Sequence, residues 1–385
     1  MNRGLGVVDY GLERESMLKV IVMAGGQGTR LWPESRKERP KQFLTLKGGR
    51  PLILDAAESL CDFISRDNVF VVTGKSMVPL VRESVPWLLE ENFVIEPFGR
   101  NTAPCIGFAA ITLLRHDPDA TMVVLSADHV IEPRDVFCDT IRFAAELVEE
   151  SPERLVTLSV KPATAATSYG YIEQSAKINS PACQKWSHFA EAFEVSRFHE
   201  KPDKETAENF VQSGKFNWNA GIFVWKAQRI YDLIVKYQPD MAKQLDKIAS
   251  AFDKDDYNDI LSQEFEQIKS ISIDYAVLEK TDSLVTVAAP FQWDDVGTWQ
   301  ALDRINEGKH DKSGNLFNSE NSIAVDSHDN IVRSDKPQQD IVLVGVDNLI
   351  VVQSEQGLLI ANKASDEKAF RTAIAELNRR KAAES

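Results

Sequence analysis

Residues 19–43, KVIVMAGGQGTRLWPESRKERPKQF, are the stretch that decides the fold. The apolar run over residues 20–23 predicts a buried strand. The loop after this strand brings successive backbone N–H groups together, an arrangement that suits phosphate oxygens. We expect the following loop residues to bind a nucleotide: Ala24, Gly25, Gly26, Gly28 and Thr29. Arg30 and Lys41 follow as cations, so the segment predicts a triphosphate cradle.

The glycines alone do not identify the ligand. Leu31 stands where the dinucleotide-binding pattern needs its third glycine, and no Gly-Lys-Ser/Thr run completes a Walker A loop. An ordinary strand-to-loop turn would use glycine equally well. A dehydrogenase is therefore not expected, and tight NAD binding by the purified protein would be needed to revive that alternative.

Length and charge limit the class of protein. A chain of 385 residues can bury a sizeable core and suggests two domains. Its 43% hydrophobic and 26% charged residues are ordinary for a globular protein, which argues against a disordered or fibrous chain. The net charge of −14 disfavours nucleic acid as a partner, because no local basic cluster offsets it.

Cysteine usage and hydropathy predict a cytoplasmic protein with no membrane partner. The four cysteines are widely spaced and form no CxxC pair, which suggests neither zinc nor a disulfide framework. No apolar run approaches the length of a membrane span, and residues 1–16 lack the hydrophobic middle of a signal peptide. We expect residues 1–17 to form a disordered extension, or to reflect an upstream choice of start codon.

Short apolar runs alternate with helical patterns after the cradle. Strands are predicted at residues 69–73, 93–95, 122–125 and 155–160, and helices at residues 52–60, 103–115 and 136–149. This alternation predicts βαβ units and a parallel sheet covered on both faces. Ligands of such sheets bind beyond the carboxyl ends of strands, where the glycine loop, Glu96 and Asp128 all fall.

The longer string GGxGTRLWPxSRxxxPKQF resembles the entry motif of the sugar-1-phosphate nucleotidylyltransferases, and within them of the mannose-1-phosphate guanylyltransferases. The resemblance implies a Rossmann-like α/β fold with a mixed sheet (GT-A-like) over residues 18–305. It also implies that Arg30 and Lys41 are catalytic. Further motifs along the chain carry the same resemblance.

Residues 96–104, EPFGRNTAP, predict a helix capped by Asn101 or Thr102. A carboxylate can in addition accept both guanine donors, N1–H and the 2-amino group, as a charge-assisted pair that adenine and cytosine cannot offer. EPxGRNTAP resembles the segment of the family that contacts the base. We hypothesise that Glu96 recognises guanine, assisted by the main chain near Asn101 and Thr102.

Two aspartates from distant parts of the chain are the candidate metal ligands. Taken alone, Asp128 in the run SADH is more typical of a turn or a helix cap. Mg²⁺, however, takes one or two carboxylates together with substrate phosphates and water. LxADH and WxDVGTW resemble the two metal-binding segments of the family, which implies Asp128 and Asp295 as Mg²⁺ ligands, with Asp128 also near the nucleotide. Asp294 is the less expected ligand, and Ser126 stands where the family commonly has proline.

Three later segments resemble the sugar-binding side of the family: YGYI at residues 169–172, FHEKP at residues 198–202 and WNAGIFVW at residues 218–225. Singly, each is explained by turn glycines, a solvated ion pair or core tryptophans. Together they predict a sugar site. Glu200 can accept from hydroxyls, Asn219 can donate and accept, Lys201 is a cation for the phosphate, and Gly170 leaves room beside the backbone.

The remaining segments predict packing rather than chemistry. Residues 227–280 read as a helical insertion, and we interpret residues 273–279 as a packing helix outside the site. Residues 306–385 contain short strand-like runs and a closing amphipathic helix over residues 369–380. In the family this region is a small β-rich domain, partly β-helix-like, that often supports dimerisation, so we expect a homodimer. Longer relatives carry an appended isomerase domain, and we expect a single activity here.

The resemblance predicts transfer of GMP from GTP to mannose 1-phosphate, with Mg²⁺ as cofactor. Two alternatives stay open at this point. The protein could transfer a nucleotide to another hexose 1-phosphate, since one hydroxyl separates mannose from glucose. It could also be a regulatory relative that binds nucleotide sugars without catalysis, although the presence of Arg30, Lys41, Asp128 and Asp295 argues against that.

Overall fold

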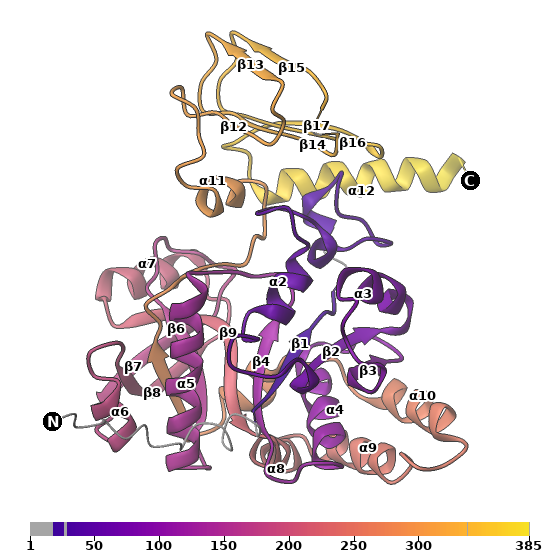
Figure 1. Cartoon of the computed structure of the whole chain (residues 1–385), viewed down its shortest axis with the longest axis vertical. Coiled ribbons are helices and arrows are strands. Elements are labelled where there is room, and N and C mark those ends of the chain that lie inside the picture. The colour runs from indigo at the N-terminus through magenta and orange to yellow at the C-terminus, as the bar shows by residue number, and fades with distance from the viewer. Residues whose placement is uncertain (1–17, 27–28, 337, 385) are drawn as a thin grey trace, which may run out of the picture. The chain divides into compact units, whose positions relative to one another are not determined.

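The computed structural model describes residues 18–26, 29–336 and 338–384 (Figure 1). The extension predicted for residues 1–17 lies outside the described residues. The contacts within the chain define two compact units. The first comprises the described residues up to Gly25 together with Ala56–Ala127 and Ile131–Trp293, and the second comprises Gly26–Asp55, Asp128–Val130 and the residues from Asp294 onward. The sequence division at residues 305 and 306 stays a prediction.

A nine-stranded mixed sheet forms the centre of the first unit, in the order β3-β2-β1-β4-β9-β6-β10-β8-β7. Strands β3, β2, β1 and β4 are parallel, whereas β9 runs antiparallel to both β4 and β6. The parallel sheet predicted from the alternation of strands and helices is therefore wrong beyond β4. The strands are β1 (Leu18–Met23), β2 (Val69–Gly74), β3 (Phe93–Glu96), β4 (Thr121–Ser126), β6 (Leu155–Val160), β7 (Tyr171–Lys177), β8 (Ala192–His199), β9 (Phe216–Lys226) and β10 (Leu284–Ala288). Strands β5 (Val130–Glu132) and β11 (Gln292–Asp294) pair separately.

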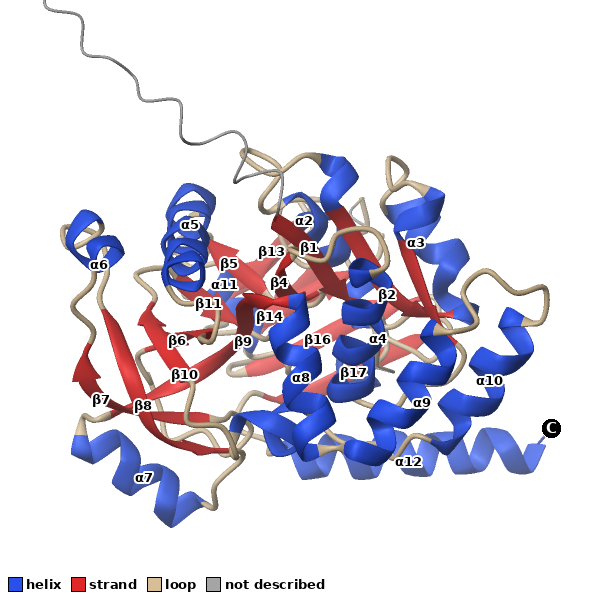
Figure 2. Cartoon of the chain, turned by 90° about the horizontal axis from the view of Figure 1, so that it is seen from below, coloured by secondary structure: helices blue, strands red, loops and turns tan. Residues whose placement is uncertain are grey.

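Helices cover both faces of this sheet (Figure 2). Helices α4, α8, α9 and α10 pack against one another, and α5 packs on β6 and β9. The helices are α2 (Leu52–Glu58), α3 (Val78–Ser84), α4 (Thr102–Leu114), α5 (Arg134–Glu150), α6 (Pro181–Lys185), α7 (Lys204–Ser213), α8 (Ala227–Tyr237), α9 (Pro239–Ala249) and α10 (Tyr257–Gln267). None of the described helices is both long and apolar enough to cross a membrane.

The side chains of β1 alternate between the two faces of the sheet, and both faces are covered. In β1, Ile21 belongs to the core cluster that contains α4, α8, α9 and α10, whereas its neighbours Val20 and Val22 are equally buried. Successive side chains of a strand point to opposite faces, so these neighbours are covered from the other side. A central strand with an unbroken apolar run is typical of such a sheet.

The second unit contains stacked short strands. Strands β12, β14 and β16 pair in parallel, β17 adds in antiparallel fashion, and β13 pairs with β15. The elements are η1 (Thr29–Leu31), η2 (Lys41–Phe43), α11 (Ala301–Ile305), β12 (Leu316–Phe317), β13 (Ser322–Val325), β14 (Ile331–Ser334), β15 (Ile341–Val344), β16 (Leu349–Ser354), β17 (Gly357–Asn362) and α12 (Glu367–Glu384). The predicted α/β fold with a mixed sheet and a β-rich C-terminal part is confirmed.

Matching side chains stack through this β-rich part. Leu316, Ile331 and Ile350 occupy equivalent positions in neighbouring strands and are buried in one cluster. Asn330 donates from its side chain to Oδ1 of buried Asn315 over 2.9 Å, and its own Oδ1 accepts from the backbone of Leu349. Repeating contacts of this kind produce the β-helix-like stacking.

Candidate functional site

The glycine loop leaves β1 at the carboxyl edge of the sheet. Ala24 is buried and donates its backbone N–H to the carbonyl of Val72 over 2.8 Å, which fixes the start of the loop. Gly26 has φ +100°, a backbone conformation that favours glycine. Gly25 lies in open space, with nothing within 4 Å of where a Cβ would stand. Gly28 lies outside the described residues, and Thr29 begins η1.

Lys41 is a buried cation at the start of η2, with only 8% of its surface exposed. Its Nζ lies 2.7 Å from Oδ2 of Asp128. The same ammonium donates to the backbone carbonyl of Asp295. Lys41 therefore joins the two aspartate segments that the sequence predicted as metal ligands.

Asp128 follows β4 and is half-buried. Burial raises the pKa of its carboxyl, but Lys41 and His129 outweigh this effect and lower the pKa below its usual range. His129 places Nε2 3.8 Å from Oδ1 of Asp128. Burial lowers the pKa of His129, so its neutral form is favoured near pH 7 even beside several carboxylates.

The segment after β11 holds two carboxylates in different environments. Asp294 accepts two hydrogen bonds from the guanidinium of Arg304, at 2.5 and 3.1 Å, and is thereby neutralised. Asp295 accepts the backbone N–H of Gly297 over 3.1 Å. Val296 follows the two aspartates and is fully buried. Its φ of +45° is strained for a β-branched residue. Such strain is concentrated at functional sites, and the two bonds from Arg304 make Asp294 the less suitable metal ligand of the two.

These residues fit a magnesium ion. The Asp128 carboxylate and the backbone carbonyl of Asp295 both contact Nζ of Lys41, which brings the two aspartates to one ammonium. Carboxylate oxygens are the donors that Mg²⁺ prefers. Within the described ranges no group of three or more His, Cys, Asp or Glu residues could hold a metal by itself. A donor set of one or two carboxylates matches an ion that completes its shell with phosphates and water.

Arg30 also belongs to the second unit. It lines a cavity of about 260 Å³, together with Trp299 and the α12 residues Phe370 and Ile374. The structure thus places Lys41, Asp128 and Asp295 together and records Arg30 at the wall of this cavity.

Glu96, the last residue of β3, is a buried carboxyl group in the first unit. Only 4% of its surface is exposed, and Oε1 is buried with no hydrogen-bond partner among the described residues. Burial raises the pKa of Glu96 to about 7. A buried acceptor without a partner is costly for the free protein and suits a ligand that brings its own donors.

Asn101 and Thr102 hold the helix that follows Glu96. Asn101 is the N-cap of α4, and its side chain accepts the backbone N–H of Thr102 over 2.8 Å. The hydroxyl of Thr102 accepts from the backbone of Ile273 over 2.8 Å. Asn101 has φ +73°, so the chain turns sharply before the helix begins. The predicted capping is confirmed.

The sugar-site candidates come together in the first unit. Asn219 donates its backbone N–H to the carbonyl of Gly170 over 2.8 Å. A Cβ on Gly170 would stand 2.8 Å from Oε2 of Glu200 and 3.5 Å from Cβ of Asn219. Lys201 has φ +47° and pairs with Oε1 of Glu200, whose side chain is 7% exposed. The predicted grouping of Gly170, Glu200, Lys201 and Asn219 is observed.

Asp274 is a member of this group that the sequence analysis left out. Its Oδ1 accepts from Nδ2 of Asn219 over 3.3 Å. Burial, together with the negative charge of Glu200, raises the pKa of Asp274 to about 7. The apolar residues beside it, Val277 and Leu278, are buried as expected for a packing helix. Residues 273–279 resemble the family's IDYAVxEK segment, but a carboxylate next to apolar residues does not by itself separate a site residue from one in a packing helix.

Comparison with known proteins agrees with this fold and identifies the family. Residues 19–312 match the family described as nucleotidyl transferase, and residues 320–369 match the mannose-phosphate isomerase/GMP-like β-helix domain. The first match covers more than half of the chain, so the chain is a member of the nucleotidyl transferase family.

Curated relatives identify the family within the nucleotidyl transferases. A mannose-1-phosphate guanylyltransferase from Klebsiella pneumoniae is 35% identical over 90% of this chain and 71% of its own length. The corresponding protein of Escherichia coli K12 is 36% identical over 91% of this chain and 71% of its own length. The chain belongs to the mannose-1-phosphate guanylyltransferase family.

Solved structures show the same architecture. A Thermus thermophilus structure, described as a mannose-1-phosphate geranyltransferase, matches with a TM-score of 0.81 and 26% identity, over 94% of this chain and 99% of that chain. A Helicobacter pylori structure described as a mannose-6-phosphate isomerase matches with a TM-score of 0.57 and 23% identity, over 72% of this chain and 99% of that chain, which shows likeness of fold alone.

Proposed function

We propose that the protein transfers GMP from GTP to α-D-mannose 1-phosphate, giving GDP-mannose and pyrophosphate. The observation that carries the proposal is the contact of Lys41 with Asp128 and Asp295. A phosphate oxygen of the sugar phosphate attacks the α-phosphorus of GTP, and the bond to the β-phosphate oxygen breaks as pyrophosphate leaves with the electron pair. The nucleophile is already an anion, so no general base is needed.

Catalysis in this proposal is mainly positioning and charge neutralisation. Lys41 neutralises charge on the α-phosphate region, and its bonds to the aspartate segments hold its ammonium in place. Arg30 stabilises the charge that develops on the leaving pyrophosphate. Gly25, Gly26 and Thr29 offer backbone N–H groups to the triphosphate, whereas the N–H of Ala24 is bonded to the carbonyl of Val72.

Asp128 and Asp295 would hold Mg²⁺, which when bound supplies positive charge and a template for the phosphate oxygens. Asp128 would then serve both the ion and Lys41, which its carboxylate already contacts. The low pKa of Asp128 supports this role, because a metal ligand must be ionised. Neutral His129 adds no positive charge that would repel the ion.

The first unit supplies recognition in this proposal. Glu96 accepts N1–H and the 2-amino group of guanine, which gives its buried oxygen a partner. Glu200, Asn219 and Asp274 bind sugar hydroxyls, and Lys201 guides the phosphate of the incoming sugar. Gly170 has no Cβ and so leaves room for the Glu200 carboxylate and, in this proposal, for the sugar beside it.

We further propose that the protein is a cytoplasmic homodimer. An apolar patch on β13 and β15, which we call the β13–β15 patch, is formed by Ile323, Val325, Val342 and Val344. These side chains are 49–66% exposed, and exposed apolar patches often mark interfaces. A second copy can cover the patch with its own equivalent, as in a two-fold dimer. Four free cysteines, three of them buried, suit a reducing compartment.

The test is release of pyrophosphate from a matrix of GTP, ATP, UTP and dTTP with mannose 1-phosphate and glucose 1-phosphate, with Mg²⁺ and with chelator. We expect release with GTP, mannose 1-phosphate and Mg²⁺. Release with another pair would retain transfer chemistry and discard the base or sugar assignment. Absence of release from folded protein with every pair would contradict the proposal.

A further inference from the structure

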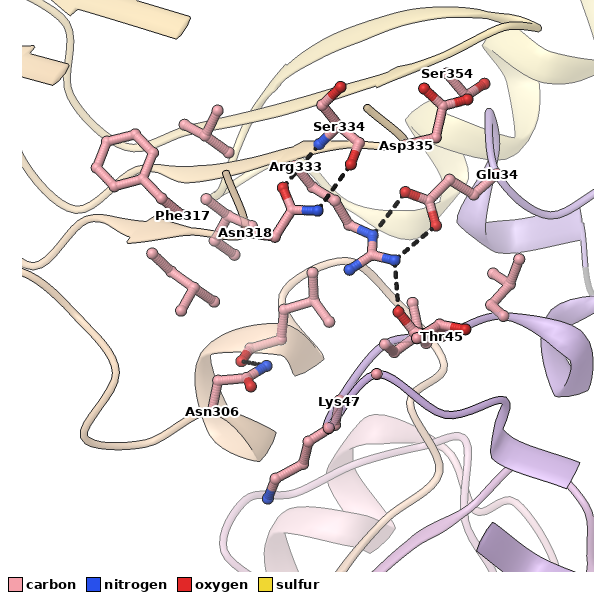
Figure 3. Close-up of a pocket in the computed structure, with 18 of the residues that line it drawn as sticks. Glu34, Thr45, Lys47, Asn306, Phe317, Asn318, Arg333, Ser334, Asp335 and Ser354 are labelled. Atoms are coloured by element: carbon pink, nitrogen blue, oxygen red, sulfur yellow. Dashed lines mark hydrogen bonds and ion pairs between the residues drawn. The ribbon is translucent and has the colours of Figure 1, made fainter. Parts of the chain in front are cut away.

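A second cavity in the second unit has no role in the transfer reaction described above. It has a volume of about 600 Å³, within the range of small-molecule sites. Its walls come from residues 34–49, from α11 and the residues after it, from β12 and β14, and from the end of β16 (Figure 3). It is therefore built on the segment that carries Lys41.

Positive charge dominates the lining. The cationic residues are Arg36, Arg39, Lys47, Lys309 and Arg333. The anionic residues are Glu34, Asp335 and Glu355. An excess of cations around one cavity stands out in a chain whose net charge is −14. Local cations of this kind attract anions even when the whole protein repels them.

Arg333 is held rigidly at the wall of the cavity. Its Nε and Nη2 donate to the two carboxylate oxygens of Glu34, at 2.6 and 3.0 Å, and Nη2 also donates to the carbonyl of Thr45 over 2.6 Å. The side chains of this ion pair are only 8% and 12% exposed. These bonds use Nε and Nη2, and in Figure 3 the third nitrogen points into the space bordered by Asn318 and Asn306. A guanidinium fixed in this way is preorganised for an oxyanion.

The rest of the lining suits a ligand larger than a bare anion. Phe317 offers an aromatic surface, and Asn306 and Asn318 offer amides on the same side of the cavity (Figure 3). Asn318 is itself anchored, because its side chain exchanges two 2.8 Å hydrogen bonds with the backbone of Ser334. An aromatic wall, amides and cations together fit a phosphorylated sugar or nucleotide.

We propose that this cavity binds a phosphate-bearing small molecule of sugar-phosphate or nucleotide size and that its occupancy regulates GMP transfer. The regulatory part rests on the proposed function. Thr45, which accepts from Arg333, lies four residues after Lys41, and Asn306 lies just beyond α11 on the segment that begins with Asp295. A ligand in the cavity contacts both of these segments. If it binds one conformation of the segments more tightly than another, its binding shifts their equilibrium and changes the rate of GMP transfer.

Binding is tested by hydrogen–deuterium exchange on the full-length protein without GTP or metal. The probes are inorganic phosphate, glucose 6-phosphate and GDP, which separate a bare anion from a sugar phosphate and a nucleotide. We expect slower exchange in residues 44–49 and 331–335 with at least one organic probe. Protection by inorganic phosphate alone, or by none of the probes, would overturn the proposed ligand class.

The variant Lys47→Ala/Lys309→Ala removes two cations from the cavity, and Lys312→Ala is the matched control outside it. We expect the double variant to bind the protecting probe at least tenfold more weakly and to keep the basal rate of GMP transfer. Lys312→Ala should bind the probe as wild type does. Equal protection in the double variant would overturn the site. Protection without any effect of the probe on transfer rate, in an enzyme that does transfer GMP, would overturn the regulatory part. Because exchange needs no turnover, the binding result stands apart from failure of the proposed reaction.

Discussion

Lys41 Nζ lies 2.7 Å from the Asp128 carboxylate, and the contact joins the cation of the glycine-loop segment to the aspartate that follows β4. The side chain of Lys41 is 11% exposed, and the carboxyl of Asp128 has a lowered pKa. The Asp128 carboxyl is therefore ionised at neutral pH, and Nζ of Lys41 also donates to the backbone carbonyl of Asp295. The contact therefore fixes three parts of the proposed phosphate site at once.

Replacement of Lys41 by methionine should slow transfer. The change removes the ammonium and leaves Asp128 without its nearest cation, so the pKa of Asp128 should rise. We expect kcat to fall about 100-fold or more, the usual loss when a group that stabilises transition-state charge is removed. Steady-state pyrophosphate release measures the effect. Lys37→Met, an exposed lysine of the same segment, is the control, and a kcat for Lys41→Met within threefold of the control would refute the assignment.

Replacement of Arg30 by alanine should lower kcat with little effect on folding. Arg30 is exposed at the wall of the smaller cavity, so its removal should cost little buried packing. We expect a loss of about 10-fold to 100-fold from lost charge stabilisation. Arg371→Ala removes a cation from the same cavity and serves as control. Wild-type turnover in Arg30→Ala, or an equal loss in Arg371→Ala, would rule out the catalytic role.

Replacement of Glu96 by glutamine should relax the choice of base. A carboxylate accepts both guanine donors, whereas an amide presents one oxygen and one NH₂ group. We expect the preference for GTP over ATP and UTP, measured as the ratio of kcat/KM values, to fall at least tenfold. An undiminished preference would show that another group recognises guanine.

The raised pKa of Glu96 also predicts a pH dependence. In the free protein the group is protonated below about pH 7, whereas an unfolded chain releases that proton near pH 4.5. The folded state therefore binds more protons between these values, and its free energy of unfolding should fall as pH rises through the window, by roughly 3 kcal/mol. Guanine donors favour the ionised form, so GTP affinity should instead rise from pH 5 to 7. Urea unfolding and GTP titration of wild type and Glu96→Gln measure both slopes, and both should flatten in the variant.

Replacement of Gly170 by alanine should weaken sugar binding. The added Cβ would stand 2.8 Å from Oε2 of Glu200 and 3.2 Å from Cζ of Phe198, so the Glu200 side chain must move. We expect KM for mannose 1-phosphate to rise about tenfold and KM for GTP to change little. Gly74→Ala is the control, because nothing lies within 4 Å of its added Cβ and its φ is −76°. Equal KM values for the sugar phosphate in the two variants would exclude Gly170 from the sugar site.

Charge introduced into the β13–β15 patch should dissociate the dimer. Val342 and Val344 are 60% and 66% exposed and contribute no buried core volume, so Val342→Glu/Val344→Glu should leave the monomer folded. We expect the dissociation constant of the dimer, measured by analytical ultracentrifugation, to rise at least 100-fold. The exposed pair Glu307→Ala/Lys312→Ala, outside the patch, is the control. A monomeric wild-type protein, or an unchanged constant, would remove the patch from the interface.

Local sequence was sufficient for most elements. The predicted helix at residues 103–115 corresponds to α4 (Thr102–Leu114), and the predicted strand at residues 155–160 is β6. The alternation of apolar strands with helices could not show that β9 runs antiparallel between β4 and β6, because strand order and direction depend on pairing between distant segments. The family resemblance, rather than periodicity, predicted the mixed sheet.

The sequence by itself determined which residue types stand at strand ends, namely a glycine loop, Glu96, Asp128 and Asp295, and that the cation Lys41 follows the glycine loop. Residue type and local pattern are properties of neighbours along the chain, so they can be read without the fold. The tertiary structure alone decided that Lys41 contacts Asp128, that Asp294 is neutralised by Arg304, and that Glu96 lies buried with a raised pKa.

The tertiary structure alone also decided the roles proposed for Asp274 and for the cavity beside Arg333. In the sequence, Asp274 is one carboxylate in a packing helix, and Arg333 is one cation in a short strand. Asp274 becomes a candidate site residue because it contacts Asn219. Arg333 becomes one because Glu34 and Thr45 hold its guanidinium in place. Burial and charge environment arise when segments far apart in the chain pack together, and local sequence does not encode that packing.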